Sequence, residues 1–253
     1  MINRLVLDIE TIPLLASLNA AYPADERQPP ANYKSDEAIA KWRAIDAKKW
    51  EAERVKECSL NPRLGRVLCI GMAGTDTKQS FVVGADTEAQ EVTALRVFWD
   101  KVRSYGGQVV TWNGSWDLQF ILLRSIALGV EPTLSPTIIR SWFRKYSVEP
   151  HFDCKAVITQ WAPPKAGEGL SQWAAFFGVE GKTDGITGAD VYQMYVDQKL
   201  VEINKYCEQD VRTTMAVYEK VVQYFCDEPL YQDESYADPV EEQEPYPRGY
   251  DDL

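Results

Sequence analysis

The chain has 253 residues, of which 45% are hydrophobic and 26% are charged, and its formal net charge is −11. This length can bury a sizeable core, so we expect one domain with additions. There is no run of 18 apolar residues and no basic segment followed by an apolar one at the start, which argues against a membrane-spanning helix and a secretion signal. The negative charge argues against nonspecific binding to polyanions, except through a local basic rim.

The cysteine and histidine content limits the kinds of site that the chain can hold. No C-x-x-C pair occurs among the five cysteines, which are Cys58, Cys69, Cys154, Cys207 and Cys226. We expect reduced, mostly buried thiols and a cytoplasmic location. The single histidine, His151, makes a zinc site improbable on composition. We interpret His151 as structural, with a position beside a substrate as the alternative.

The first predicted element is a strand that carries two carboxylates. The apolar run Leu5-Val6-Leu7 leads into Asp8-Ile9-Glu10-Thr11, which predicts a buried strand that ends near Thr11. Residues two apart share one side of a strand, so Asp8 and Glu10 lie together. Neighbouring carboxylates repel each other unless a cation joins them, and oxygen ligands suit Mg²⁺ or Mn²⁺. The alternative is a strand end with solvated acids.

A long insertion separates this strand from the next. Pro13 is expected to end the strand, and a loop is expected over about residues 14–30. Ser35 is a candidate cap for a helix that runs to about Cys58. We expect a helical arm within residues 14–60, either a solvated helix or a lid that faces a substrate.

The middle of the chain alternates between strand and helix patterns. We expect strands over 66–73, 79–83 and 108–112, and helices over 88–105, capped by Thr87, and 118–127. The run Asn113-Gly114-Ser115-Trp116-Asp117 joins the last of these strands to the last helix. Asp117 therefore lies at a helix entrance, either as a third carboxylate of a site or only as a helix cap.

The last part of the chain is predicted to be mainly helical. We expect edge or linker segments at 137–140 and 151–153, a loop at 181–185, and helices over 169–178, 190–199 and 201–225. In the last helix, Tyr206 and Asp210 are four residues apart and share one face. The alternative is a tyrosine at the core edge beside a surface acid. We expect residues 226–253 to form a disordered acidic tail.

Three motifs occur in a fixed order. They are D-x-E at Asp8 and Glu10, N-x-x-x-D at Asn113 and Asp117, and Y-x-x-x-D at Tyr206 and Asp210. In this order they resemble the DEDD 3′–5′ exonucleases of the ribonuclease H-like (DnaQ-like) superfamily, in the tyrosine subclass, DEDDy.

The chain is similar in particular to the predicted exonucleases related to the exonuclease domain of family B DNA polymerases. Three further segments are also similar to this group, at residues 151–153, 169–171 and 181–185. The histidine subclass would need a histidine where Lys205 stands. The resemblance covers about residues 1–225. It implies an α/β, three-layer fold with a central mixed β-sheet flanked by helices, here with a helical insertion after the first strand.

The resemblance also implies a mechanism. Two Mg²⁺ or Mn²⁺ ions, about 4 Å apart, would hold the attacking and leaving oxygens. Their ligands would be Asp8, Glu10, Asp117 and Asp210, and Asp8 would contact both ions. Tyr206 would orient the attacking water. The product would be a 5′-nucleoside monophosphate released from a 3′ end.

The resemblance further implies where the substrate lies. Thr11 and Leu14 match positions that contact the terminal nucleotide, and Asn113 and Trp116 match positions near the scissile bond. The expected substrate is a DNA 3′ end, preferably single-stranded, with no membrane partner. The alternatives are an exoribonuclease and a catalytically silent module that binds nucleic acid or a protein. A protein partner could bind the arm or the tail.

Overall fold

The protein is described here by a computed structural model, in which residues 2–19, 29–163, 167–181 and 185–226 are placed. One five-stranded sheet has the order β3-β2-β1-β4-β5. The strands are β1 (Leu5–Pro13), β2 (Gly65–Gly74), β3 (Ser80–Gly84), β4 (Val109–Thr111) and β5 (His151–Asp153). The pairs β1–β2 and β2–β3 are antiparallel, whereas β1–β4 and β4–β5 are parallel. The predicted mixed sheet is therefore confirmed.

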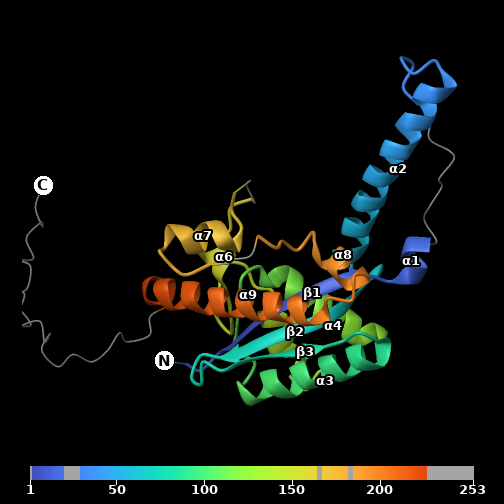
Figure 1. Ribbon diagram of the computed structural model, residues 1–253. Helices are drawn as coiled ribbons and strands as arrows, with labels where there is room; N and C mark the ends of the chain where they lie inside the picture. The colour runs from blue at the N-terminus through green and yellow to red at the C-terminus, as the bar shows by residue number, and fades with distance from the viewer. Residues whose placement is uncertain (1, 20–28, 164–166, 182–184, 227–253) are drawn as a thin grey trace, which may run out of the picture.

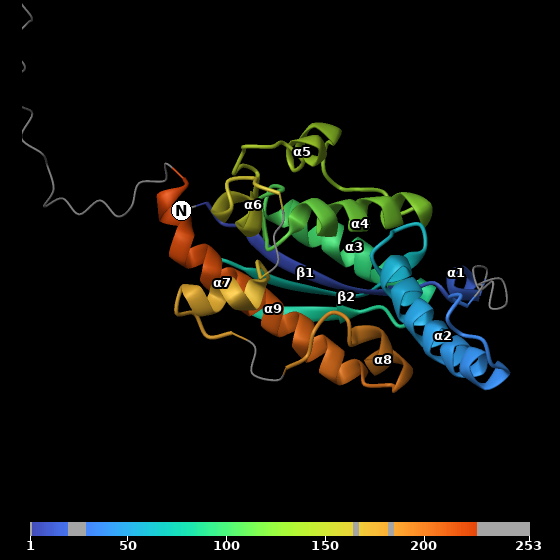
Figure 2. The same ribbon diagram turned by 90° about the horizontal axis from the view of Figure 1, so that it is seen from above.

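The described residues also form helices. They are α1 (Leu15–Asn19), α2 (Asp36–Ser59), α3 (Glu88–Ser104), α4 (Gly114–Ala127), α5 (Pro136–Ser141), α6 (Cys154–Ile158), α7 (Leu170–Phe176), α8 (Val191–Val196) and α9 (Leu200–Val221), and α9 continues into the short 3₁₀ turn η1 (Val222–Tyr224). Figures 1 and 2 show α9 on one face of the sheet and α3 with α4 on the other. The expected three-layer fold with flanking helices is thus the observed one.

The central strand β1 determines which side chains face which helix layer. Leu5, Leu7 and Ile9 belong to the core cluster that contains α3 and α4, whereas Val6 packs with residues of α9. Side chains alternate along a strand, so Asp8 and Glu10 lie on the α9 side with Val6. The register with β2 shifts between Glu10 and Thr11. The two carboxylates therefore lie on β1 next to a bulge, facing α9.

Several predicted boundaries were wrong. The strand β1 ends at Pro13 instead of Thr11, since a proline at a strand end sacrifices little pairing. The loop predicted at 14–30 contains α1, and the segment predicted as an edge or linker at 137–140 is α5, which begins at Pro136. The helix predicted over 118–127 begins at Gly114.

Other local predictions were confirmed. The Ser35 hydroxyl accepts a hydrogen bond from the Ala38 amide and caps α2, and Thr87 with Gln90 forms a capping box on α3. The helix predicted over 169–178 is α7, which ends at Phe176, and Gly178 just beyond it has φ +64°, the left-handed conformation common after helix ends. Segment 151–153 is the edge strand β5. The predicted acidic tail, apart from Cys226, lies outside the described residues.

The arm is a 24-residue helix, α2, and projects from the body of the protein (Figure 1). At 1.5 Å per residue it is about 36 Å long. Cys58, in its last turn, is its buried residue. The arm therefore contacts the rest of the protein mainly at its C-terminal end, close to β1.

Within the described part of the chain, every helix is too short or too polar to cross a membrane.

Candidate functional site

Three carboxylates from two distant segments meet on the α9 face of the sheet. Asp8 and Glu10 come from β1 and Asp210 from α9, and one oxygen of each lies within 4.8 Å of the others. Asp8 is half-buried, whereas Glu10 and Asp210 are buried. Like charges this close and this poorly hydrated repel each other strongly. The cluster therefore favours a bound cation.

Gly71 of β2 allows α9 to approach the sheet at this place. Gly71 pairs with Asp8 across the two strands. A β-carbon at residue 71 would lie 2.8 Å from a Val211 methyl carbon and 2.9 Å from Cys207 Sγ. The Cys207 thiol also contacts the Asp8 carbonyl oxygen, at 3.6 Å. Close contact between helix and sheet thus brings Asp210 to the carboxylates of β1.

Tyr206 lies among the same carboxylates. Its side chain is buried on α9, one turn before Asp210. Burial raises the pKa of the Tyr206 hydroxyl, and the charges of Glu10, Asp210 and Asp8 raise it further. The hydroxyl therefore remains protonated near neutral pH and can donate a hydrogen bond within the site. The alternative of a surface acid at residue 210 is wrong, because Asp210 is buried.

Asp117 approaches the cluster from α4. It is buried in the first turn of that helix, whose N-cap residue is Asn113. Burial raises the pKa of Asp117 to about 8, and the charges of Asp153 and Asp210 contribute. The cap position of α4 belongs to Asn113, so Asp117 is not the N-cap residue of this helix. Asp117 lies within electrostatic reach of Asp210, but the cluster of three does not include it.

Asp153 is a further buried carboxylate that the sequence analysis missed. It ends β5. One carboxylate oxygen accepts from the Ala156 amide at 3.0 Å, and the other accepts from the Ser115 amide at 3.3 Å. The available signal was an acid directly after an apolar residue in a short strand pattern, Phe152-Asp153, but that segment was interpreted as an edge or linker.

His151, two residues earlier, uses both ring nitrogens in buried hydrogen bonds. Nδ1 lies 2.8 Å from the Trp142 carbonyl oxygen and Nε2 lies 2.8 Å from the Thr111 hydroxyl. A carbonyl only accepts, so Nδ1 donates and Nε2 accepts from Thr111. Burial lowers the pKa of His151. These contacts fit the structural interpretation of this residue.

The four predicted substrate-contact positions have different surroundings. The Thr11 hydroxyl donates to the Ser59 carbonyl at 2.7 Å, and the Trp116 indole N–H donates to the Leu60 carbonyl at 3.0 Å. Leu14 is half-buried, and Asn113 is exposed with no side-chain capping bond to α4. Thr11 and Trp116 therefore contact the base of the arm, next to Glu10 and Asp117 in the chain.

The carboxylate cluster fits Mg²⁺ or Mn²⁺. All of its donors are carboxylate oxygens, which these ions prefer, and the three oxygens are close enough to share a cation. Three negative charges also match the high charge of divalent ions. The residues present are therefore suitable ligands for the expected ions.

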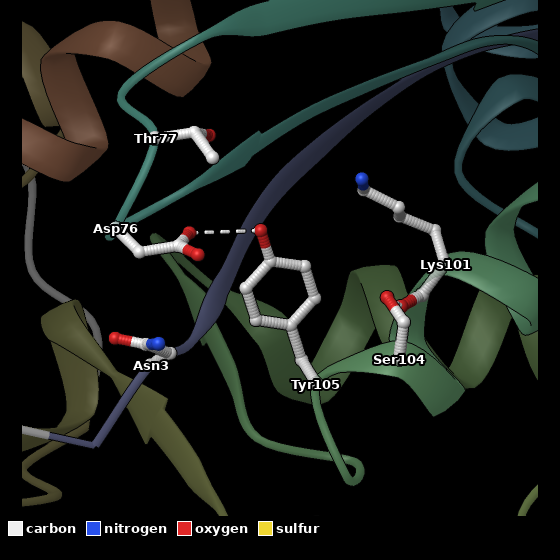
Figure 3. A pocket seen from close by; sticks show the side chains of 6 residues that line it. All are labelled: Asn3, Asp76, Thr77, Lys101, Ser104 and Tyr105. Carbon is white, nitrogen blue, oxygen red and sulfur yellow. Dashed lines mark hydrogen bonds between the residues drawn. The ribbon is translucent and has the colours of Figure 1, made fainter.

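A polar hollow lies away from the carboxylate cluster, between the N-terminal end of β1, the β2–β3 turn and the end of α3. Its volume is about 400 Å³, and its lining residues are Asn3, Asp76, Thr77, Lys101, Ser104 and Tyr105 (Figure 3). The Tyr105 hydroxyl donates to Asp76 Oδ1 at 3.0 Å, which lowers the pKa of Asp76. None of the predicted site residues lines this hollow.

Comparison with known families identifies the chain. The sequence model of one family, described as predicted 3′–5′ exonuclease related to the exonuclease domain of PolB, matches residues 60–241. This range includes Asp117, Tyr206 and Asp210 but begins after Asp8 and Glu10. A comparison with curated proteins gives no significant match. The match spans more than half of the sequence, and the chain therefore belongs to the family of predicted 3′–5′ exonucleases related to the exonuclease domain of PolB.

Proposed function

We propose that this protein is a metal-dependent 3′–5′ exonuclease that removes 5′-nucleoside monophosphates from DNA, preferably single-stranded. Membership of an exonuclease family implies a nucleic-acid substrate. The observation that carries the proposal is the meeting of Asp8, Glu10 and Asp210 within 4.8 Å. Residues 1–225 would form the nuclease domain, with residues 14–60 as an insertion and 226–253 as a tail.

The proposed roles follow from the position of each side chain. Asp8, Glu10 and Asp210 would hold Mg²⁺ or Mn²⁺, and Asp117 would complete the ligand set from α4. When bound, the ions would polarise the phosphate and lower the pKa of water. Tyr206 stays protonated among these carboxylates, so its hydroxyl would orient the attacking water by a hydrogen bond.

The proposed substrate contacts surround this group. Thr11, Leu14, Asn113 and Trp116 would line the path of the terminal nucleotides. Asn113 is exposed and Trp116 is half-buried in the first turn of α4, within four residues of Asp117. Trp116 packs against Phe120 with ring centroids 5.4 Å apart, so a base that stacks on Trp116 would meet a ring held in place.

The test is degradation of a single-stranded DNA oligomer labelled at its 5′ end, with Mg²⁺, Mn²⁺ or EDTA. We expect a ladder that shortens from the 3′ end with either metal and no cleavage with EDTA. Asp8→Ala and Asp210→Ala should abolish the ladder. Asp100→Ala, which removes an exposed carboxylate of α3, is the matched control and should retain the wild-type rate.

A matched RNA oligomer and a duplex DNA test the substrate preference. Faster degradation of RNA than of DNA would show that RNA, and not DNA, is the preferred substrate. No cleavage of either with both metals would favour a catalytically silent binding module. Wild-type rates for Asp8→Ala would reject the proposed site.

A further inference from the structure

The first turn of α4 lacks its usual side-chain cap. The first amide groups of a helix have no partner within the helix, and a side chain at the N-cap commonly accepts from one of them. The N-cap residue of α4 is Asn113, and its side chain makes no such bond. The amide of Ser115 instead donates to Asp153 Oδ2, 3.3 Å away on β5. The cap of α4 thus comes from a different strand.

Asp153 is itself held in a fixed position. Its Oδ1 accepts from the Ala156 amide at 3.0 Å and caps α6, the helix that follows β5 directly. The residue is 9% exposed. Because each oxygen of the carboxylate contacts a backbone amide, the group links β5, α6 and the first turn of α4 in one arrangement.

The same turn of α4 also packs against two side chains, one from β4 and one from β5. A β-carbon on Gly114 would lie 2.1 Å from Thr111 Oγ1 and 2.4 Å from His151 Nε2. These two side chains are hydrogen-bonded to each other, and His151 is also bonded to the Trp142 carbonyl. The turn therefore rests directly on a fixed polar pair from β4 and β5, which leaves room only for glycine at residue 114.

We propose that Asp153 is a positioning residue that directs Asp117 toward Asp210 by capping α4 through the Ser115 amide. Asp117 follows Ser115 by two residues in the same helical turn, so movement of that turn moves its carboxylate. The inference rests on the proposed function, in which Asp117 completes the ligand set, and we assign Asp117 to the second of the two expected ions. We assign Asp153 an action through the backbone, because each of its oxygens contacts an amide and the carboxylate cluster of Asp8, Glu10 and Asp210 does not include it.

The bond can be removed at the donor without changing Asp153. Ser115→Pro deletes the amide hydrogen, and proline is accepted in the first turn of a helix. Ser115→Ala is the matched control, because it keeps the amide and changes only an exposed side chain. Asp153→Asn is the complementary variant, since its amide side chain retains only one acceptor oxygen.

The readout is Mn²⁺ binding to the full-length chain by calorimetry, together with thermal melting and the Mn²⁺ concentration for half-maximal cleavage. We expect two ions in the wild type. Ser115→Pro and Asp153→Asn should raise the Kd of the second ion by about 10–100-fold, the range seen when residues that hold metal ligands by hydrogen bonds are replaced. The Kd of the first ion should change by less than about twofold. Saturating Mn²⁺ should restore most of the wild-type cleavage rate.

Three results would overturn the inference. Wild-type affinity for both ions in Ser115→Pro and Asp153→Asn would remove the positioning role and leave the proposed function intact. An equal loss of affinity for both ions together with a lower melting temperature would indicate a general structural role. A loss of affinity for the second ion in Ser115→Ala would indicate the same. A wild-type chain that neither binds Mn²⁺ nor cleaves would reject the proposed function and this inference with it. If Asp153→Asn does not fold, the two Ser115 variants decide.

Discussion

The indole N–H of Trp116 donates a hydrogen bond to the backbone carbonyl of Leu60, 3.0 Å away, and joins the first turn of α4 to the end of the arm. The Thr11 hydroxyl makes a matching bond to the carbonyl of Ser59 at 2.7 Å. Each donor is the chain neighbour of a proposed ligand, Asp117 or Glu10. The base of α2 is therefore attached to the two elements that carry these ligands.

Replacement of Trp116 by phenylalanine should loosen the base of the arm. The ring can still pack on Phe120, but the bond to Leu60 is lost, which costs about 1 kcal/mol. We expect amide hydrogen exchange over residues 56–61 to rise about fivefold. Trp42→Phe, a change further out on α2, should leave these amides unchanged. Equal exchange in wild type and Trp116→Phe would show that the bond does not hold the arm.

Removal of a ligand should leave the metal-free fold intact. Asp210→Ala relieves repulsion among the three carboxylates, so the melting temperature in EDTA should be equal to or above that of the wild type. At 100 times its Kd, Mn²⁺ should stabilise the wild type by about 2.7 kcal/mol. Asp210→Ala should lose most of this stabilisation, and Asp100→Ala should keep it. A large destabilisation of Asp210→Ala in EDTA would contradict the expectation.

Tyr206→Phe should slow cleavage without preventing metal binding. The hydroxyl lies among the carboxylates and stays protonated, so its loss removes one hydrogen bond to the attacking water. The attacking water gains negative charge as it reacts, and a hydrogen bond to a charged group is worth about 1.5–3 kcal/mol, or roughly 10–150-fold in rate. Mn²⁺ affinity should be unchanged by calorimetry. Tyr105→Phe, in the distant hollow, is the control, and a wild-type rate for Tyr206→Phe would remove its proposed role.

The stability of the metal-free protein should depend on pH through Asp117. Its pKa in the folded protein is about 8, against about 4 in an unfolded chain. The folded state thus holds this proton more tightly. The contribution of Asp117 to the free energy of unfolding therefore falls as the pH rises from about 4 to about 8, and is constant at higher pH.

Denaturation by urea in EDTA across this pH range measures the effect. The slope from Asp117 should reach at most about 1.4 kcal/mol per pH unit. Asp117→Asn cannot titrate and should lack this part of the slope. Parallel curves for wild type and Asp117→Asn would contradict the raised pKa.

A buried ion pair joins α3 to α4 away from the site. Two guanidinium nitrogens of Arg124 each lie 2.8 Å from a Glu91 carboxylate oxygen, and Glu91 also accepts from the Val67 amide. Arg124→Met leaves a buried charge without its partner, so we expect a loss of about 3–5 kcal/mol in urea denaturation. Arg103→Met breaks the exposed pair with Asp100 and should cost less than about 1 kcal/mol. Similar losses in both variants would contradict this difference.

Local rules determined much of this protein from its sequence. The two-residue alternation of a strand placed Asp8 and Glu10 on one side of β1, and the four-residue spacing of a helix placed Tyr206 and Asp210 on one face of α9. Caps at Ser35 and Thr87 were predicted because a capping side chain contacts amides only a few residues away. The mixed sheet and its flanking helices followed from the resemblance, which rests on ordered motifs.

Contacts between distant segments were decided only by the tertiary structure. Asp153 caps α4 from β5, and Thr11 and Trp116 bond to the end of α2. The sequence predicted only an edge or linker segment for 151–153, and contacts to a nucleotide for Thr11 and Trp116. A hydrogen bond between residues far apart in the chain leaves no periodic pattern in either segment. The partners of these side chains depend on how the sheet order brings the strand and helix ends together, which the spacing of residues along the chain does not encode.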